Sequence, residues 1–118
     1  MSPLNKKKYE SGQLVTINVS TQNEGYATYS GNDSNGYVFY EKIDLKSYPS
    51  HNDFLGNEFR LNNGDKAAIV KELGYPERML FHMHRNDYNV YEILVNGVIC
   101  HAFQKDLMLT SFPEHLNE

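Results

Sequence analysis

His82 and His84 are the residues whose type and spacing best suit metal chemistry. In an extended segment, side chains two residues apart point to the same face, so both imidazoles could bind one ion. Asp87, Glu92 or His101 would have to complete the ligand set. Two histidines without a fixed third ligand are more typical of a loop or an edge strand. The sequence therefore predicts no metal site and no cofactor, with a small metal-dependent enzyme using His82 and His84 as an alternative.

Nucleophilic and acid–base chemistry has little support in the rest of the chain. Cys100 is the only cysteine and lies in an apolar run, which favours a buried, inert thiol. Glu92 and His101 are expected to face each other across a hairpin, which favours a structural ion pair over a catalytic pair. The chain has no Gly-rich phosphate loop, nucleophile elbow or paired-carboxylate motif. We predict no catalytic residue and a protein that is not an enzyme.

Tyrosine is the abundant aromatic residue, with nine copies and no tryptophan in the chain. Tyr26, Tyr29, Tyr37 and Tyr40 cluster on one expected hairpin, where strand alternation would expose about half of them. Exposed aromatic strips on small β-domains bind peptides or single-stranded nucleic acid. Buried tyrosines instead fill a core and leave their hydroxyls at its rim. These four tyrosines are the candidate partner-binding residues, and core packing is the alternative.

The clearest structural signal is a hairpin at residues 90–103, where two β-rich runs flank Asn96-Gly97. A two-residue loop fixes the register and pairs Val95 with Val98 and Glu92 with His101. One face of this hairpin is apolar and must be buried: Tyr91, Ile93, Val95, Val98, Cys100 and Ala102.

The other face of the hairpin is also partly apolar, which is unusual for the outside of a small sheet. It carries Val90, Leu94, Ile99 and Phe103 around the Glu92–His101 pair. We expect these residues to be covered, either by a second copy of the protein or by apolar residues of the same chain, namely Phe54, Leu55 and Phe59.

Composition divides the chain into two β-rich parts. Further strands are predicted at residues 13–19, 25–29, 37–40 and 43–48. Residues 66–70 are also predicted as a strand, although the alanines there and the following Gly74 and Pro76 would suit a short helix. The expected organisation is a polar tail (1–10), a first β-unit (11–50), a linker (51–63), a second β-unit (64–113) and a tail (114–118).

An internal repeat matches residues 39–49 with residues 103–113, which would make the chain a tandem of two related β-units. The second unit combines Gly64-Asp65, the Asn96-Gly97 hairpin and the ending Phe103-Gln-Lys-Asp-Leu-Met-Leu109. This pattern resembles small Src-homology-3-like barrel proteins, most closely short accessory proteins encoded by tailed bacteriophages. The resemblance implies a mainly β fold with one or two small barrels and an accessory or structural role. Such barrels host many functions, so the fold alone does not assign one.

Charge and hydropathy restrict the partners. The net charge of −4 argues against tight binding of duplex nucleic acid, because phosphate contacts need a basic face and the one basic cluster is Lys6 to Lys8. No apolar run is long enough to span a membrane and no signal sequence is evident. With a single cysteine, this predicts a cytoplasmic protein, in the host-cell cytoplasm or the virion if phage-encoded.

Together these patterns predict a non-enzymatic module that binds a protein partner or itself. A nucleic-acid-associated small barrel, using Lys6 to Lys8 and exposed aromatics, is the second hypothesis.

Overall fold

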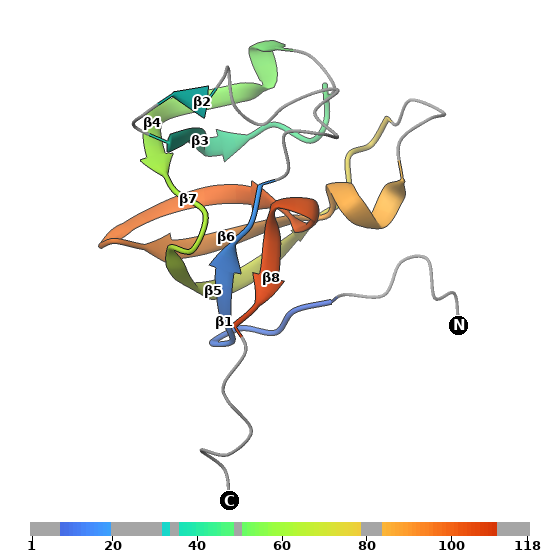
Figure 1. Cartoon of the computed structure of the whole chain (residues 1–118). Helices are drawn as coiled ribbons and strands as arrows, with labels where there is room; N and C mark the ends of the chain where they lie inside the picture. Colours follow the sequence, from blue (N-terminus) through green and yellow to red (C-terminus); the bar gives the residue numbers. More distant parts are fainter. Residues whose placement is uncertain (1–7, 20–31, 34–35, 49–50, 79–83, 111–118) are drawn as a thin grey trace, which may run out of the picture.

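The computed structural model describes residues 8–19, 32–33, 36–48, 51–78 and 84–110 (Figure 1). These residues form one eight-stranded antiparallel sheet with short 3₁₀ turns and no α-helix, which confirms the mainly β prediction. Within this part of the chain, no helix has the length and apolar character needed to cross a membrane. The strands are β1 (Leu14–Ile17), β2 (Asn32–Asp33), β3 (Gly36–Ile43), β4 (Phe54–Leu61), β5 (Lys66–Gly74), β6 (Val90–Val95), β7 (Val98–Phe103) and β8 (Leu107–Leu109).

The strand order is β2-β3-β7-β6-β5-β1-β8, and β4 pairs with β3 outside this order. The sheet is therefore not closed, because β2 and β8 lie at its two ends. β1 lies between β5 and β8, so a strand from the expected first unit is built into the sheet of the second. In Figure 1, β2, β3 and β4 form a separate layer above the β5–β6–β7 meander.

The β6–β7 hairpin has the predicted register at every pair, from Val90 opposite Phe103 to Val95 opposite Val98. Asn96 and Gly97 have φ values of 53° and 82°, as a two-residue hairpin loop of this type requires. The strand predicted at residues 66–70 is also confirmed and extends to Gly74. Its alternate residues Ala67 and Ile69 are buried, and this burial favours a strand over the competing helix.

Two segments differ from their predicted structure. The strand predicted at residues 43–48 is absent: β3 ends at Ile43, and residues 45–47 form a turn. The Asp44 carboxylate accepts hydrogen bonds from the Lys46 backbone N–H and the Ser47 hydroxyl, a local arrangement that competes with a strand. Residues 51–63, expected as a linker, contain β4, which pairs with β3 along its length.

The main core lies between β1, β3, β5, β6, β7 and β8 and the end of β4, and it also takes in Tyr9 from the segment before β1. The predicted buried face of the hairpin contributes Tyr91, Ile93, Val95, Cys100 and Ala102, all at most 1% exposed. Val98, the sixth residue of that face, is half-buried. This part of the prediction is confirmed.

A second, aromatic core covers part of the opposite face of the hairpin. Val90 and Phe103 are fully buried there against Tyr48, Tyr88 and Ile43, with Phe54 packed at the edge. The Phe103 ring centre lies 5.3 Å from that of Tyr48 and 5.1 Å from that of Tyr88. The same chain therefore covers half of this face, as expected, and Phe54 takes part. Leu55 is exposed instead, and Phe59 packs against the main core.

Candidate functional site

The residues predicted to bind a partner or a metal are only partly within the described structure. Tyr26, Tyr29 and His82 lie outside the described residues. Tyr37 and Tyr40 belong to β3, where both are half-buried and pack against the main core. His84 is exposed just before the 3₁₀ turn at Arg85–Tyr88. In the described segments, no group of three His, Cys, Asp or Glu side chains is placed to hold a metal ion.

Glu92 and His101 face each other across β6 and β7, with 3.6 Å between Glu92 Oε2 and His101 Nε2. His101 Nδ1 accepts a hydrogen bond from the Ile43 backbone N–H at 3.0 Å, so a neutral ring carries its proton on Nε2, toward Glu92. Burial lowers the pKa of His101, and the opposing effect of Glu92 is smaller; Lys42 and Lys71 lower this pKa further. The neutral His101 ring therefore joins β7 to Ile43 at the end of β3. This contact lies close to the point where Tyr40 of β3 pairs with His101.

Because the pKa of His101 is lower in the folded than in the unfolded protein, stability should depend on pH. The contribution of the neutral His101 ring to folding stability is complete above the pKa of the unfolded protein, about 6.5. It is lost as the pH falls from there through the lower pKa of the folded protein. We expect the urea midpoint to fall between pH 7.5 and pH 5.5, because protonation removes the acceptor for the Ile43 N–H. In His101→Gln, which keeps a side-chain acceptor that does not titrate, the fall should be smaller. Equal pH dependence in both proteins would contradict this role.

A buried polar cluster around Tyr91 was not predicted from the sequence. Tyr91 Oη accepts hydrogen bonds from the backbone N–H groups of Lys8 and Tyr9, at 3.0 and 3.2 Å. Asn89 Nδ2 also donates to Tyr91 Oη, at 3.2 Å, and to Glu72 Oε2, at 2.8 Å. The Tyr91 hydroxyl in turn lies 3.4 Å from Gln104 Oε1. Lys8 and Tyr9 lie 83 and 82 positions before Tyr91, so no spacing pattern in the sequence reveals their contacts with it.

The Tyr91 cluster is structural in character. Tyr91 and Asn89 are both fully buried, which keeps a substrate away from them. Burial raises the pKa of Tyr91, while the hydrogen bonds from Tyr9, Lys8 and Asn89 act in the opposite direction. The hydroxyl is therefore neutral at physiological pH, and its function is to fasten the N-terminal segment to the sheet.

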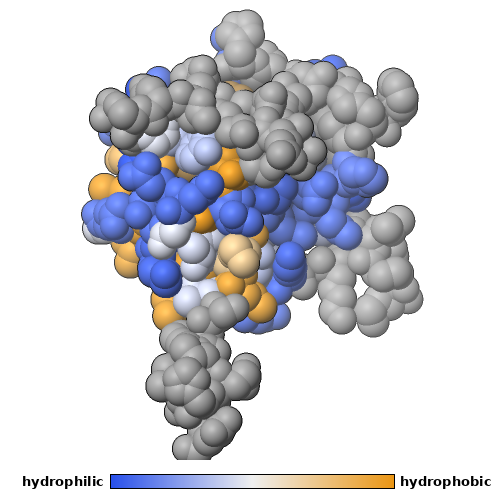
Figure 2. Space-filling model, viewed as in Figure 1, coloured by the Kyte–Doolittle hydropathy of each residue, from blue (hydrophilic) through white to orange (hydrophobic). Residues whose placement is uncertain are grey.

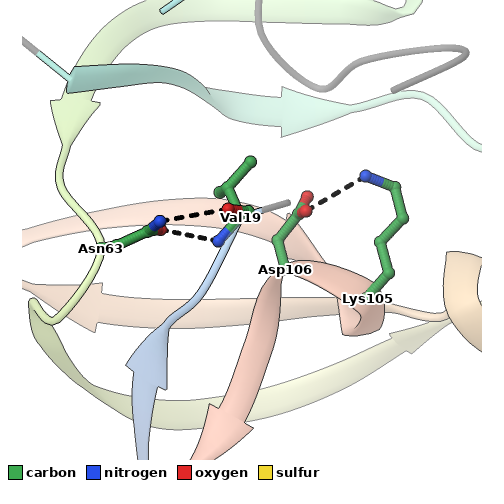
Figure 3. Close-up of polar contacts among 4 residues, drawn as sticks. All are labelled: Val19, Asn63, Lys105 and Asp106. Carbon is green, nitrogen blue, oxygen red and sulfur yellow. Dashed lines mark hydrogen bonds and ion pairs between the residues drawn. The ribbon is translucent and has the colours of Figure 1, made fainter. Parts of the chain in front are cut away.

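The acidic residue of the C-terminal sequence motif, Asp106, also has a structural place (Figure 3). It lies in the 3₁₀ turn between β7 and β8, is 1% exposed, and pairs with Lys105 at 3.1 Å. Its backbone carbonyl accepts the Asn18 N–H just after β1. Close by, the Asn63 side-chain amide bonds to both the N–H and the C=O of Val19, at 2.7 and 3.1 Å. These contacts hold the end of β1 between β5 and β8.

The surface feature that stands out is a row of apolar residues on the outer face of the sheet. Leu14 pairs with Ala68, Ala68 with Leu94, and Leu94 with Ile99, so the row crosses β1, β5, β6 and β7. Leu14, Leu94 and Ile99 are 44%, 43% and 41% exposed. We call these four residues the apolar stripe. Figure 2 shows exposed hydrophobic residues toward the hairpin end of β6 and β7.

A charged row borders the apolar stripe on the same face. Across a bulge in β5, Lys71 pairs with Glu92, and Glu92 pairs with His101. Lys71 is exposed and Glu92 is half-buried. The outer face thus carries the apolar stripe, which crosses four strands. Beside it lies a row that contains the exposed ammonium of Lys71 and the carboxylate of Glu92.

No protein-family model, curated protein or solved structure matches this chain, so its own residues are the basis for a functional assignment.

Proposed function

We propose that this protein is a non-enzymatic interaction module, a small Src-homology-3-like barrel with an added β2–β4 layer, which binds a protein partner through the apolar stripe. The chain from β5 onward supports this proposal. It runs as a strand, a loop, the β6–β7 hairpin, a short turn at Gln104–Asp106 and a last strand, which is the pattern on which the resemblance rests. An accessory or structural role in a tailed phage is part of the same proposal.

The observation that carries the proposed function is the exposed apolar stripe. The outward face of a sheet in a small protein is usually polar, because apolar side chains there gain nothing from folding. Here the second core covers Val90 and Phe103, whereas Leu94 and Ile99 on the same hairpin face stay exposed. A binding partner that buries the stripe accounts for this arrangement.

Cys100 and His101 both have structural positions within the sheet, which favours binding over catalysis at these two residues. Burial raises the pKa of the Cys100 thiol to about 12, so the thiolate needed for nucleophilic attack is scarce at neutral pH. The His101 ring nitrogens are directed at Ile43 and Glu92 within the sheet.

Affinity capture with matched variants tests the proposed surface. Tagged wild-type protein, Leu94→Glu and Leu55→Glu are used to capture proteins from the native host, and the bound proteins are quantified. Leu55 is the control because it is also a strand leucine and equally exposed at 43%, but it lies on β4. We expect a partner to bind wild type and Leu55→Glu and to be lost with Leu94→Glu. Equal binding to all three proteins would show that the stripe is not the binding surface.

A further inference from the structure

We propose that the partner seated on the apolar stripe is a second copy of this chain, packed face to face in a two-fold symmetric dimer. This inference rests on the proposed function and names the partner of the same surface. In an isologous dimer the same patch meets itself, so its two halves must complement each other when they are exchanged by the two-fold axis. An axis running along the strands, between β5 and β6, gives this complementarity.

At its centre, the apolar stripe is complementary to itself in side-chain size. The axis places β5 over β6 of the second copy and β1 over β7 of the second copy. Ala68 then faces Leu94 of the other copy, and Leu14 faces Ile99. A small residue opposite a large one lets the side chains of two stacked sheets interdigitate, as they do in β-sandwiches.

The charged row is complementary in the same orientation. Lys71 and Glu92 are register partners on β5 and β6, so the axis that exchanges these strands places Lys71 over Glu92 of the other copy. Two such pairs would form per dimer at the border of the apolar contact. An axis running along the stripe would not bring these two rows together, so the charges select between the two orientations.

The size of the surface sets the expected affinity. A standard stable interface buries about 800 Å² per partner, and four side chains supply only part of this area. The dimer is therefore expected to be weak and to form at micromolar or higher protein concentrations, as small transient interfaces do.

Sedimentation velocity over a concentration series tests the dimer with the full chain. We expect wild type and Leu55→Glu to sediment as a monomer–dimer equilibrium. Leu94→Glu should dimerise about tenfold or more weakly, because it places two unpaired carboxylates in the contact. Far-UV circular dichroism and thermal unfolding check that each variant is folded. Unchanged dimerisation of Leu94→Glu would overturn this inference, because the dimer would then use a surface other than the apolar stripe.

A charge-exchange experiment tests the orientation. In Lys71→Glu both members of the pair are acidic, and in Glu92→Lys both are basic, so each variant alone should be monomeric through repulsion. When the two variants are mixed, every contact between copies joins a carboxylate to a lysine, and a heterodimer should form. Pairing within one chain cannot produce this rescue. A mixture that stays monomeric would overturn the proposed orientation.

A wild-type chain that remains monomeric at all concentrations would overturn the second copy as the partner. The proposed function would still stand if a different protein were captured in a Leu94-dependent manner, so the two failures are distinguishable.

Discussion

Replacing Tyr91 with Phe is expected to lower the free energy of unfolding by about 2–4 kcal/mol, although only one oxygen atom is removed. That oxygen accepts hydrogen bonds from the backbone N–H groups of Lys8 and Tyr9 and from Asn89. Asn89 is fully buried and keeps Glu72 as a partner, whereas the two backbone donors lose the acceptor that the structure gives them. Urea unfolding at pH 7.5 measures the change.

Tyr40→Phe is the matched control for this prediction. Tyr40 also lies in a strand of the sheet, and among the described residues its hydroxyl makes no hydrogen bond, so the expected change is within about 0.5 kcal/mol. Hydrogen exchange adds a local readout: the amides of Lys8 and Tyr9 should exchange faster in Tyr91→Phe. A loss of stability as small as that of Tyr40→Phe would show that the cluster does not hold the N-terminal segment.

Phe103→Ala is expected to destabilise the protein by about 3–5 kcal/mol, the usual range for a buried phenylalanine. Phe103 is fully buried in the second core, and its ring lies against Tyr48 and Tyr88, with the Phe54 ring centre 6.5 Å away. These rings come from the β3–β4 layer and from the segment before β6. Truncation therefore removes the part of the apolar contact between the β3–β4 layer and β6–β7 that the second core supplies.

The same variant should loosen the two layers unequally. β3 pairs with β7 at one residue pair, Tyr40 and His101, and Val38 and Phe39 of β3 are buried in the main core, so the aromatic core is one of the contacts that attach the β3–β4 layer. Amides in β3 and β4 should lose more protection from hydrogen exchange than amides in β1 and β5. Leu55→Ala, at an exposed position of β4, is the control and should change stability by less than about 0.5 kcal/mol. Uniform loss of protection would mean that the sheet unfolds as one unit.

Local interactions explain the parts of the fold that could be predicted from the sequence. The β6–β7 hairpin depends on Asn96 and Gly97, whose preference for positive φ sets the loop and hence the whole register. The buried face of the hairpin and the burial of Cys100 follow from that register. The pairing of Glu92 with His101 was predictable for the same reason.

Pairing between strands that are distant in the sequence explains why β4 could not be predicted. The apolar residues of β4 do not alternate, and its middle is polar and exposed, because among the described strands it is paired only on its β3 side; its pattern therefore resembles that of a linker. The strand predicted at residues 43–48 is absent for a local reason instead, because the Asp44 carboxylate accepts the Lys46 N–H and so stabilises a turn.

The candidate site likewise has a part that could be predicted from the sequence and a part that could not. Leu94 and Ile99 could be placed side by side from the sequence, because the hairpin turn joins them directly. Ala68 joins the apolar stripe through the pairing of β5 with β6. Leu14 joins it only because β1 inserts between β5 and β8, which places Leu14 beside Ala68, 54 positions later in the sequence. The Tyr91 cluster likewise joins Lys8 to a residue 83 positions later. Side-chain chemistry near a turn acts within a few residues and is visible in the sequence, whereas contacts across such long loops depend on how the whole chain packs, and only the tertiary structure decides them.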